Sequence, residues 1–144
     1  MRTFTYPAVF EPGEKAGVVV VTFPDVPEAI SQGDDEADAR AMGSDALGVA
    51  LLGLLSVNRP LPKASKPRPG QLMLTVDADI AAKLAVIEAF NDAQITQAEL
   101  AKRLGKDAKE VRRILDPDHP TKMPALVSAL SALGRRLVIG VEAA

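Results

Sequence analysis

The sequence lacks cysteine and tryptophan and has a single histidine, His119, among its 144 residues. Without thiols and with one imidazole, the chain cannot form disulfides, cysteine nucleophiles, redox pairs or the His/Cys cages that bind zinc. Aromatic residues are also scarce, with four Phe and one Tyr. This disfavours an RNA-binding sheet, because such sheets stack bases on exposed rings. We therefore expect a protein that needs neither a metal nor a cofactor.

Long hydrophobic runs are missing too. The best one, from Ala46 to Leu55, has ten residues, whereas a membrane helix needs roughly 20. We therefore expect a cytoplasmic protein with no membrane partner. The length fits one domain or two very small ones.

The formal net charge of −2 hides an asymmetry along the chain. Residues 1–65 carry five positive and nine negative side chains, a charge of −4, whereas residues 66–144 carry twelve and ten, a charge of +2. Six of the basic residues lie between Lys102 and Arg113, where the only acids are Asp107 and Glu110. The acidic half indicates a basic partner, and the local excess of +4 indicates an anion-binding face.

A proline-rich stretch divides the chain. Residues 58–70, NRPLPKASKPRPG, contain four prolines and four basic residues. Because proline lacks an amide donor and holds the preceding residue extended, this stretch is predicted to be a semi-rigid linker. The predicted domains are therefore residues 1–57 and 71–144, with the linker between them.

The first predicted domain is a small sheet with one helix. Alternating and β-branched patterns predict strands over residues 4–10, 17–23 and 29–33, and apolar spacing predicts a helix over residues 35–55. The helix contains three glycines, each of which costs about 1 kcal/mol relative to alanine inside a helix. Packing against the sheet must therefore supply most of its stability.

The second predicted domain is mostly helical. Helices are expected over residues 77–91 and 124–133, with two shorter ones between them. Strands are expected over residues 71–76 and 137–141, and the sequence leaves open whether the former joins the first sheet or pairs with the latter. The fold class is α+β, with a small sheet and helix followed by an all-α domain that ends in a strand.

The most informative segment is residues 95–115, ITQAELAKRLGKDAKEVRRIL. Thr96 with Glu99, and Asp107 with Glu110, have the spacing of capping boxes, so two separately capped short helices lie close together. This is the pattern of a helix-turn-helix unit, whose second helix enters the major groove of DNA.

Exposed positions of this unit are the predicted DNA contacts. Arg and Lys suit guanine edges and phosphates, and a recognition helix reads mainly with its N-terminal half. Gln97, at the start of the first helix, is expected to clamp a phosphate. The alternative is that the basic side chains only form the solvated face of amphipathic helices. The predicted contacts are Gln97, Lys106, Ala108, Lys109, Arg112 and Arg113. A single unit contacts too little DNA for useful affinity, so we expect a homodimer or larger homo-oligomer that binds symmetric half-sites.

The order of these parts resembles a known family. A FPDVPE loop, an SQGDDEADA run, the proline-rich connector and the helix-turn-helix segment together resemble the helix-turn-helix subtype of the HicB family of antitoxins, over essentially the whole chain. The resemblance implies a type II toxin–antitoxin system. Its N-terminal domain, similar to a truncated ribonuclease H sheet, would bind a small basic HicA-type toxin that cleaves mRNA, and its C-terminal domain would repress the operon by binding operator DNA.

The resemblance also implies toxin contacts in the loop after the second strand and at the start of the first helix. These residues are Phe23, Pro24, Asp25, Asp34, Asp35 and Asp38. The same region holds the acids that a two-metal nuclease would need. However, acids at the start of a helix are favoured by the helix dipole alone, and His119 has no partner acid or nucleophile in sequence. No catalytic residue is therefore assigned, although a residual nuclease and a stand-alone phage-type regulator remain alternatives to the antitoxin.

Overall fold

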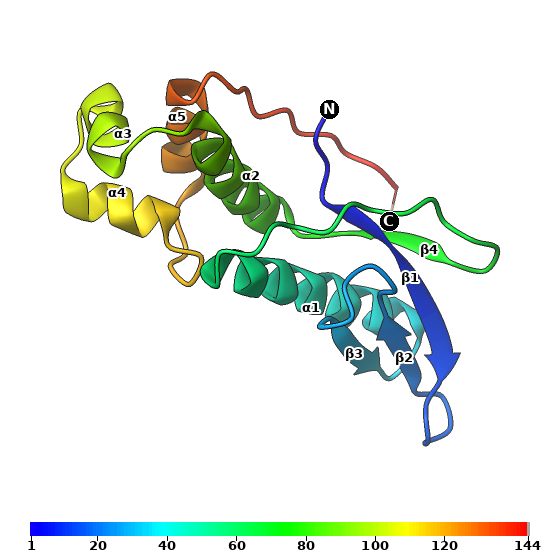
Figure 1. The fold of residues 1–144 in the computed structure, drawn as a ribbon. Helices are drawn as coiled ribbons and strands as arrows, with labels where there is room; N and C mark the ends of the chain where they lie inside the picture. The colour runs from blue at the N-terminus through cyan, green and yellow to red at the C-terminus, as the bar shows by residue number, and fades with distance from the viewer. Residues whose placement is uncertain (144) are drawn as a thin grey trace. The chain divides into compact units, whose positions relative to one another are not determined.

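The computed structural model describes residues 1–143 and divides into two compact units. The first unit is Met1–Asp77, and the second begins at Ala78 (Figure 1). The first unit contains all the strands and one helix, and the second contains only helices. The predicted α+β class is confirmed.

An antiparallel four-stranded sheet forms the centre of the first unit, in the order β3-β2-β1-β4. Its strands are β1 (Thr5–Pro12), β2 (Val19–Thr22), β3 (Ile30–Gly33) and β4 (Leu72–Thr75). The three strands predicted before the proline-rich stretch are all present, with slightly different ends. In the register of the sheet, Phe10 lies opposite Val21 and Tyr6 lies opposite Leu74.

The pairing of β4 with β1 answers the question that the sequence left open. The proline-rich stretch therefore lies inside the first unit, and the boundary between the units falls at Asp77 rather than within residues 58–70. Hydrogen bonds to Tyr6 and Asp25 hold the stretch in place. Tyr6 Oη donates to the Pro62 carbonyl at 2.6 Å, and the Ser65 amide donates to Asp25 Oδ2 at 2.8 Å.

Helix α1 (Glu36–Ser56) packs on the sheet. Gly43 allows the close approach, because a Cβ at this position would lie 3.1 Å from side-chain carbons of both Val21 and Leu74. Gly48 is also buried, whereas Gly53 is exposed and a Cβ there would meet nothing within 4 Å. The predicted packing of this helix on the sheet is present, and it explains Gly43 but not Gly53.

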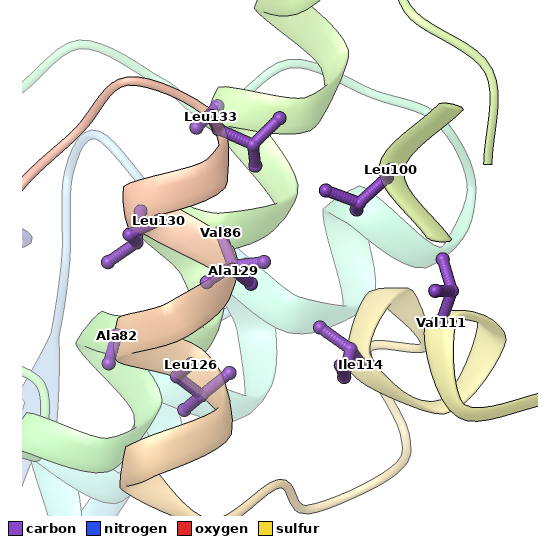
Figure 2. Packing of buried hydrophobic residues seen from close by; sticks show 10 residues of the cluster. Ala82, Val86, Leu100, Val111, Ile114, Leu126, Ala129, Leu130 and Leu133 are labelled. Carbon is purple, nitrogen blue, oxygen red and sulfur yellow. The ribbon is translucent and has the colours of Figure 1, made fainter. Parts of the chain in front are cut away.

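The second unit consists of four helices around one apolar cluster. They are α2 (Ala78–Ala93), α3 (Gln97–Leu104), α4 (Ala108–Leu115) and α5 (Met123–Ala132). Figure 2 shows side chains from all four helices meeting in this cluster. Its buried members are Ala82, Val86, Ala89, Leu100, Val111, Ile114, Leu126, Ala129, Leu130 and Leu133.

The predicted C-terminal strand over residues 137–141 is wrong for the single chain. Residues 135–143 form no helix or strand, and Val138, Ile139 and Val141 are exposed. The physical reason is the lack of a partner. The strand considered as its partner, β4, pairs with β1, and no strand within residues 1–143 pairs with this segment.

Candidate nucleic-acid interface

Helices α3 and α4 form a capped helix-turn-helix pair. Thr96 Oγ1 accepts the Glu99 amide at 3.1 Å, and Asp107 Oδ1 accepts the Glu110 amide at 2.8 Å. Between the helices, Gly105 ends α3 in the left-handed conformation, with φ of 64°, a conformation that glycine adopts without steric cost. The two predicted helix starts are confirmed.

The glutamates of the two boxes make ion pairs within their own turns. Glu99 Oε1 lies 3.2 Å from Arg103 Nε, and Glu110 Oε2 lies 3.9 Å from Lys106 Nζ. Arg103 also donates to the Ala132 carbonyl at 3.1 Å. Part of the basic charge between residues 102 and 113 is therefore used inside the unit.

Apolar side chains fix the orientation of the two helices. Leu100 of α3 and Val111 of α4 are fully buried, and Ile114 is nearly so. They join the cluster of the second unit (Figure 2), where Ile95 packs against it just before the Thr96 cap. Because these residues seat the inner face of α4, the positions between them must point away from the core.

The outward face of α4 carries three cations. Lys109, Arg112 and Arg113 are exposed, and their side chains make no ion pair or hydrogen bond with any other residue of the part that the structure describes. Residues three and four apart share one face of a helix, so the three charges form a single surface. We call Lys109, Arg112 and Arg113 the α4 basic face.

The other predicted DNA contacts surround this face. Gln97 is exposed at the first position of α3, and Ala108 is exposed at the first position of α4. Lys106 lies in the turn, and its side chain is 33% exposed beside Glu110. The structure thus places Lys106 and Ala108 at the end of α4 from which a recognition helix reads.

A residue that the sequence did not single out supports the far end of α4. Lys83 of α2 is 4% exposed, and its Nζ donates to the Arg113 carbonyl at 2.9 Å and to Thr121 Oγ1 at 2.8 Å. Burial lowers the pKa of Lys83 to about 8, and the negative charge of Asp116 partly opposes this. The only signal in the sequence was a lone charge within the apolar run IAAKLAVI.

The residues suggested for toxin binding are less available. Asp25 accepts two bonds from Ser65, Asp35 Oδ1 accepts the Asp38 amide at 2.8 Å, and Asp38 Oδ2 accepts the Asp34 amide at 2.9 Å. Phe23 is buried in the core, whereas Pro24 beside it is exposed. The first role of most of these side chains is therefore to shape the loop and to cap α1.

Nothing in the described part gathers into a metal centre or a membrane helix. Residues 1–143 contain no group of three or more His, Asp or Glu side chains placed to hold a metal ion. Over the same residues, no helix has the length and apolar character needed to cross a membrane. The amide of His119 donates to the Asp116 carbonyl at 3.1 Å, within the turn that follows α4.

Known proteins match the chain over most of its length. Residues 5–85 match the family model described as HicB_like antitoxin of bacterial toxin-antitoxin system. Antitoxin HicB 1 of Photorhabdus laumondii is 38% identical over 143 residues, which cover 99% of this chain and 90% of that protein. Antitoxin HicB of Escherichia coli K12 is 35% identical over 132 residues, covering 92% and 95%, respectively. This chain therefore belongs to the HicB-like antitoxin family.

Proposed function

We propose that the chain inhibits a HicA-type toxin through its first unit and represses its own operon by binding operator DNA through α4. The observation that carries the DNA-binding half is the α4 basic face. Three exposed cations without internal partners stand on one side of a short helix, and that helix follows a separately capped helix across a three-residue turn.

Charge and geometry both favour DNA as the ligand of this face. Lys and Arg neutralise phosphates, and Arg also donates in a bidentate manner to guanine edges. A side chain held in an internal ion pair would have to give up that partner first. Lys109, Arg112 and Arg113 have no such partner in residues 1–143, so their full charge faces outward. Gln97, at the positive end of α3, supplies an amide to a backbone phosphate.

A homodimer completes this half of the proposal. One helix-turn-helix unit contacts a single half-site, and dimers bind two half-sites about one helical turn apart. The operator is therefore expected to be an inverted repeat.

The toxin-binding half rests on the family and on charge. Proteins of similar sequence are named antitoxins, and residues 1–77 carry seven positive and ten negative side chains, which suits a basic toxin. Within the suggested set, Pro24 and Asp34 are exposed and their side chains make no hydrogen bond within the described chain. We propose these two as direct contacts, with the other residues holding the loop and helix start in shape.

A titration against operator DNA tests the α4 assignment. Lys109→Ala with Arg112→Ala is expected to weaken binding at least ten-fold and to lower the slope of log K against log salt by about two, because each lost phosphate contact removes about one. Lys15→Ala with Arg40→Ala removes the same charge from exposed positions of the first unit and serves as the control. Equal binding and equal slopes for the two double variants would refute the assignment.

Co-purification with a HicA-type toxin tests the other half. Asp34→Arg is expected to weaken capture of the toxin, because it places a positive charge against a basic partner. Asp118→Arg makes the same change at an exposed acid of the second unit and is expected to leave capture unchanged. Equal capture by both variants would show that the toxin binds elsewhere.

A further inference from the structure

The C-terminal segment Leu137–Val141 has the properties of a strand without a partner. We propose that it pairs in antiparallel fashion with the same segment of a second copy of this chain, about a two-fold axis at Ile139. This inference deepens the proposed function, because it names the surface that forms the DNA-binding dimer.

In the single chain, this segment exposes apolar side chains, and its backbone pairs with no strand. Val138, Ile139 and Val141 are 56%, 64% and 99% exposed, and residues 135–143 belong to no helix or strand. Valine and isoleucine favour extended pairing. An extended apolar segment with an open backbone edge is a ready template for another strand.

The root of the segment is fixed to the helical core. The Arg135 amide donates to the Leu130 carbonyl at 2.9 Å, and Arg135 Nη2 lies 3.8 Å from Asp92 Oδ2. Leu137 then packs against the apolar cluster of the second unit. The segment therefore begins at a fixed point on the helical core.

The alternation of side chains along the segment suits antiparallel pairing with the same segment of a second copy. In an antiparallel pair centred on Ile139, Leu137 lies opposite Val141 of the second copy, and Val138 lies opposite Gly140. Residues two apart share a face of a strand, so Leu137, Ile139 and Val141 of both copies gather on one side. That side is the one on which Leu137 already meets the helical cluster, so the ribbon would extend the core with six apolar side chains.

The flanking charges fit the same register. One step beyond the apolar segment, Arg136 of one copy lies opposite Glu142 of the other, and the two-fold axis repeats this pair at the other end. In residues 1–143 neither side chain makes an ion pair or a hydrogen bond. Opposite charges placed directly across a sheet stabilise it, and like charges destabilise it. Such self-complementarity is what a two-fold interface requires, and it favours a second copy over an unrelated strand.

Charge reversal tests the register in the full-length protein. Arg136→Glu alone or Glu142→Arg alone turns two attractive pairs into two repulsive ones, so each is expected to weaken the homodimer about ten-fold in sedimentation equilibrium. The double variant restores both pairs and is expected to dimerise like the unmodified chain. A mixture of the two single variants is expected to form heterodimers in preference to either homodimer.

A cysteine at the axis gives an independent readout. The chain contains no cysteine, so Ile139→Cys introduces a single thiol that meets its own copy across the two-fold axis. Mild oxidation is expected to give a disulfide-linked dimer in high yield. Val127→Cys, at another exposed position of the second unit, is the control and is expected to cross-link only at background level.

The outcomes separate this inference from the proposed function. If the chain is dimeric and binds operator DNA, but every tail variant dimerises normally and Ile139→Cys cross-links no better than Val127→Cys, the tail pairing is wrong and DNA binding stands. If the unmodified chain remains a monomer even on saturated operator DNA, both the tail pairing and the dimeric repressor are wrong.

Discussion

The charged residues suggested for binding differ between the two units, both in sign and in whether they bond within their own chain. In the first unit, Asp25, Asp35 and Asp38 all accept hydrogen bonds from their own chain. In the second unit, the α4 basic face has no internal partner within residues 1–143. A charged residue that the chain itself requires is a weaker candidate for binding than one that the chain leaves unsatisfied. This difference supports the proposal of DNA binding by the α4 basic face more strongly than it supports toxin binding by Asp25, Asp35 or Asp38.

The largest expected effect concerns whether the two units are separate cores. Leu100→Ala removes a fully buried side chain of the second unit and is expected to cost about 2–5 kcal/mol in that unit. Hydrogen exchange should show lost protection in α3 to α5 and normal protection in β1 to β3. Leu51→Ala in α1 is the matched control and should give the reverse pattern. Equal loss of protection in both units after either change would show a single cooperative core.

Lys83 gives the next largest effect, because it holds the C-terminal end of the helix that carries the basic face. Lys83→Met leaves the Arg113 carbonyl and Thr121 Oγ1 without their donor, a loss of about 1–3 kcal/mol for buried polar groups. Operator binding is expected to weaken although residue 83 is buried. Unchanged stability together with unchanged DNA affinity would show that Lys83 contributes neither to the fold nor to DNA binding.

The pKa of Lys83 gives the same variant a pH signature. The folded-state pKa, about 8, lies below the unfolded value of 10.5, so between these pH values the unfolded chain binds more protons. The free energy of unfolding of the unmodified chain, relative to that of Lys83→Met, is therefore expected to rise from pH 8 to 10.5. Below pH 8 the difference between the two chains should be flat, because Lys83 is protonated in both states. A flat difference throughout would contradict the lowered pKa of Lys83.

A smaller effect separates the capping role of Asp35 from a role in binding. Asp35→Ala removes the N-cap of α1 and is expected to lower the free energy of unfolding by about 1 kcal/mol. Asp35→Ser keeps a capping oxygen without the charge and should restore most of the stability. Normal toxin capture by Asp35→Ser would assign Asp35 to the fold alone, and weakened capture by this stable variant would add it to the contact surface.

The smallest effect concerns the glycines of α1. Gly53→Ala places a methyl group where nothing lies within 4 Å and is expected to raise the free energy of unfolding by roughly 0.5–1 kcal/mol. Gly43→Ala should lower it, because the new methyl would lie 3.1 Å from Val21 and Leu74. Thermal denaturation of the two variants measures both signs. Destabilisation by Gly53→Ala would show that another surface covers that position.

Local patterns predicted most of the elements. The three strands before the proline-rich stretch, helix α1 and the two capped helices follow from spacing and from side-chain caps, which depend on near neighbours in sequence. The pairing of β4 with β1 was not predictable in this way, because it joins residues about 70 apart through backbone bonds. Proline composition marked a boundary, but the bonds of Pro62 and Ser65 to Tyr6 and Asp25 hold that stretch to the first unit.

The candidate site likewise contains one part that local patterns predicted and one part that they did not. The α4 basic face was predictable because helical spacing alone places its three cations together. The support from Lys83 was not predictable, since its acceptors lie 30 and 38 residues away. The predicted tail strand shows a further limit, because strand propensity does not reveal whether the partner belongs to the same chain.

The most direct test of the division between the units measures both partners on one variant. The chain with Lys109→Ala and Arg112→Ala is titrated with operator DNA and, in parallel, with the HicA-type toxin by calorimetry. DNA binding is expected to fall at least ten-fold, while toxin affinity is expected to stay within about two-fold of that of the unmodified chain. Unchanged DNA binding, or a comparable loss of toxin affinity, would contradict the assignment of the α4 basic face to DNA and of the first unit to the toxin.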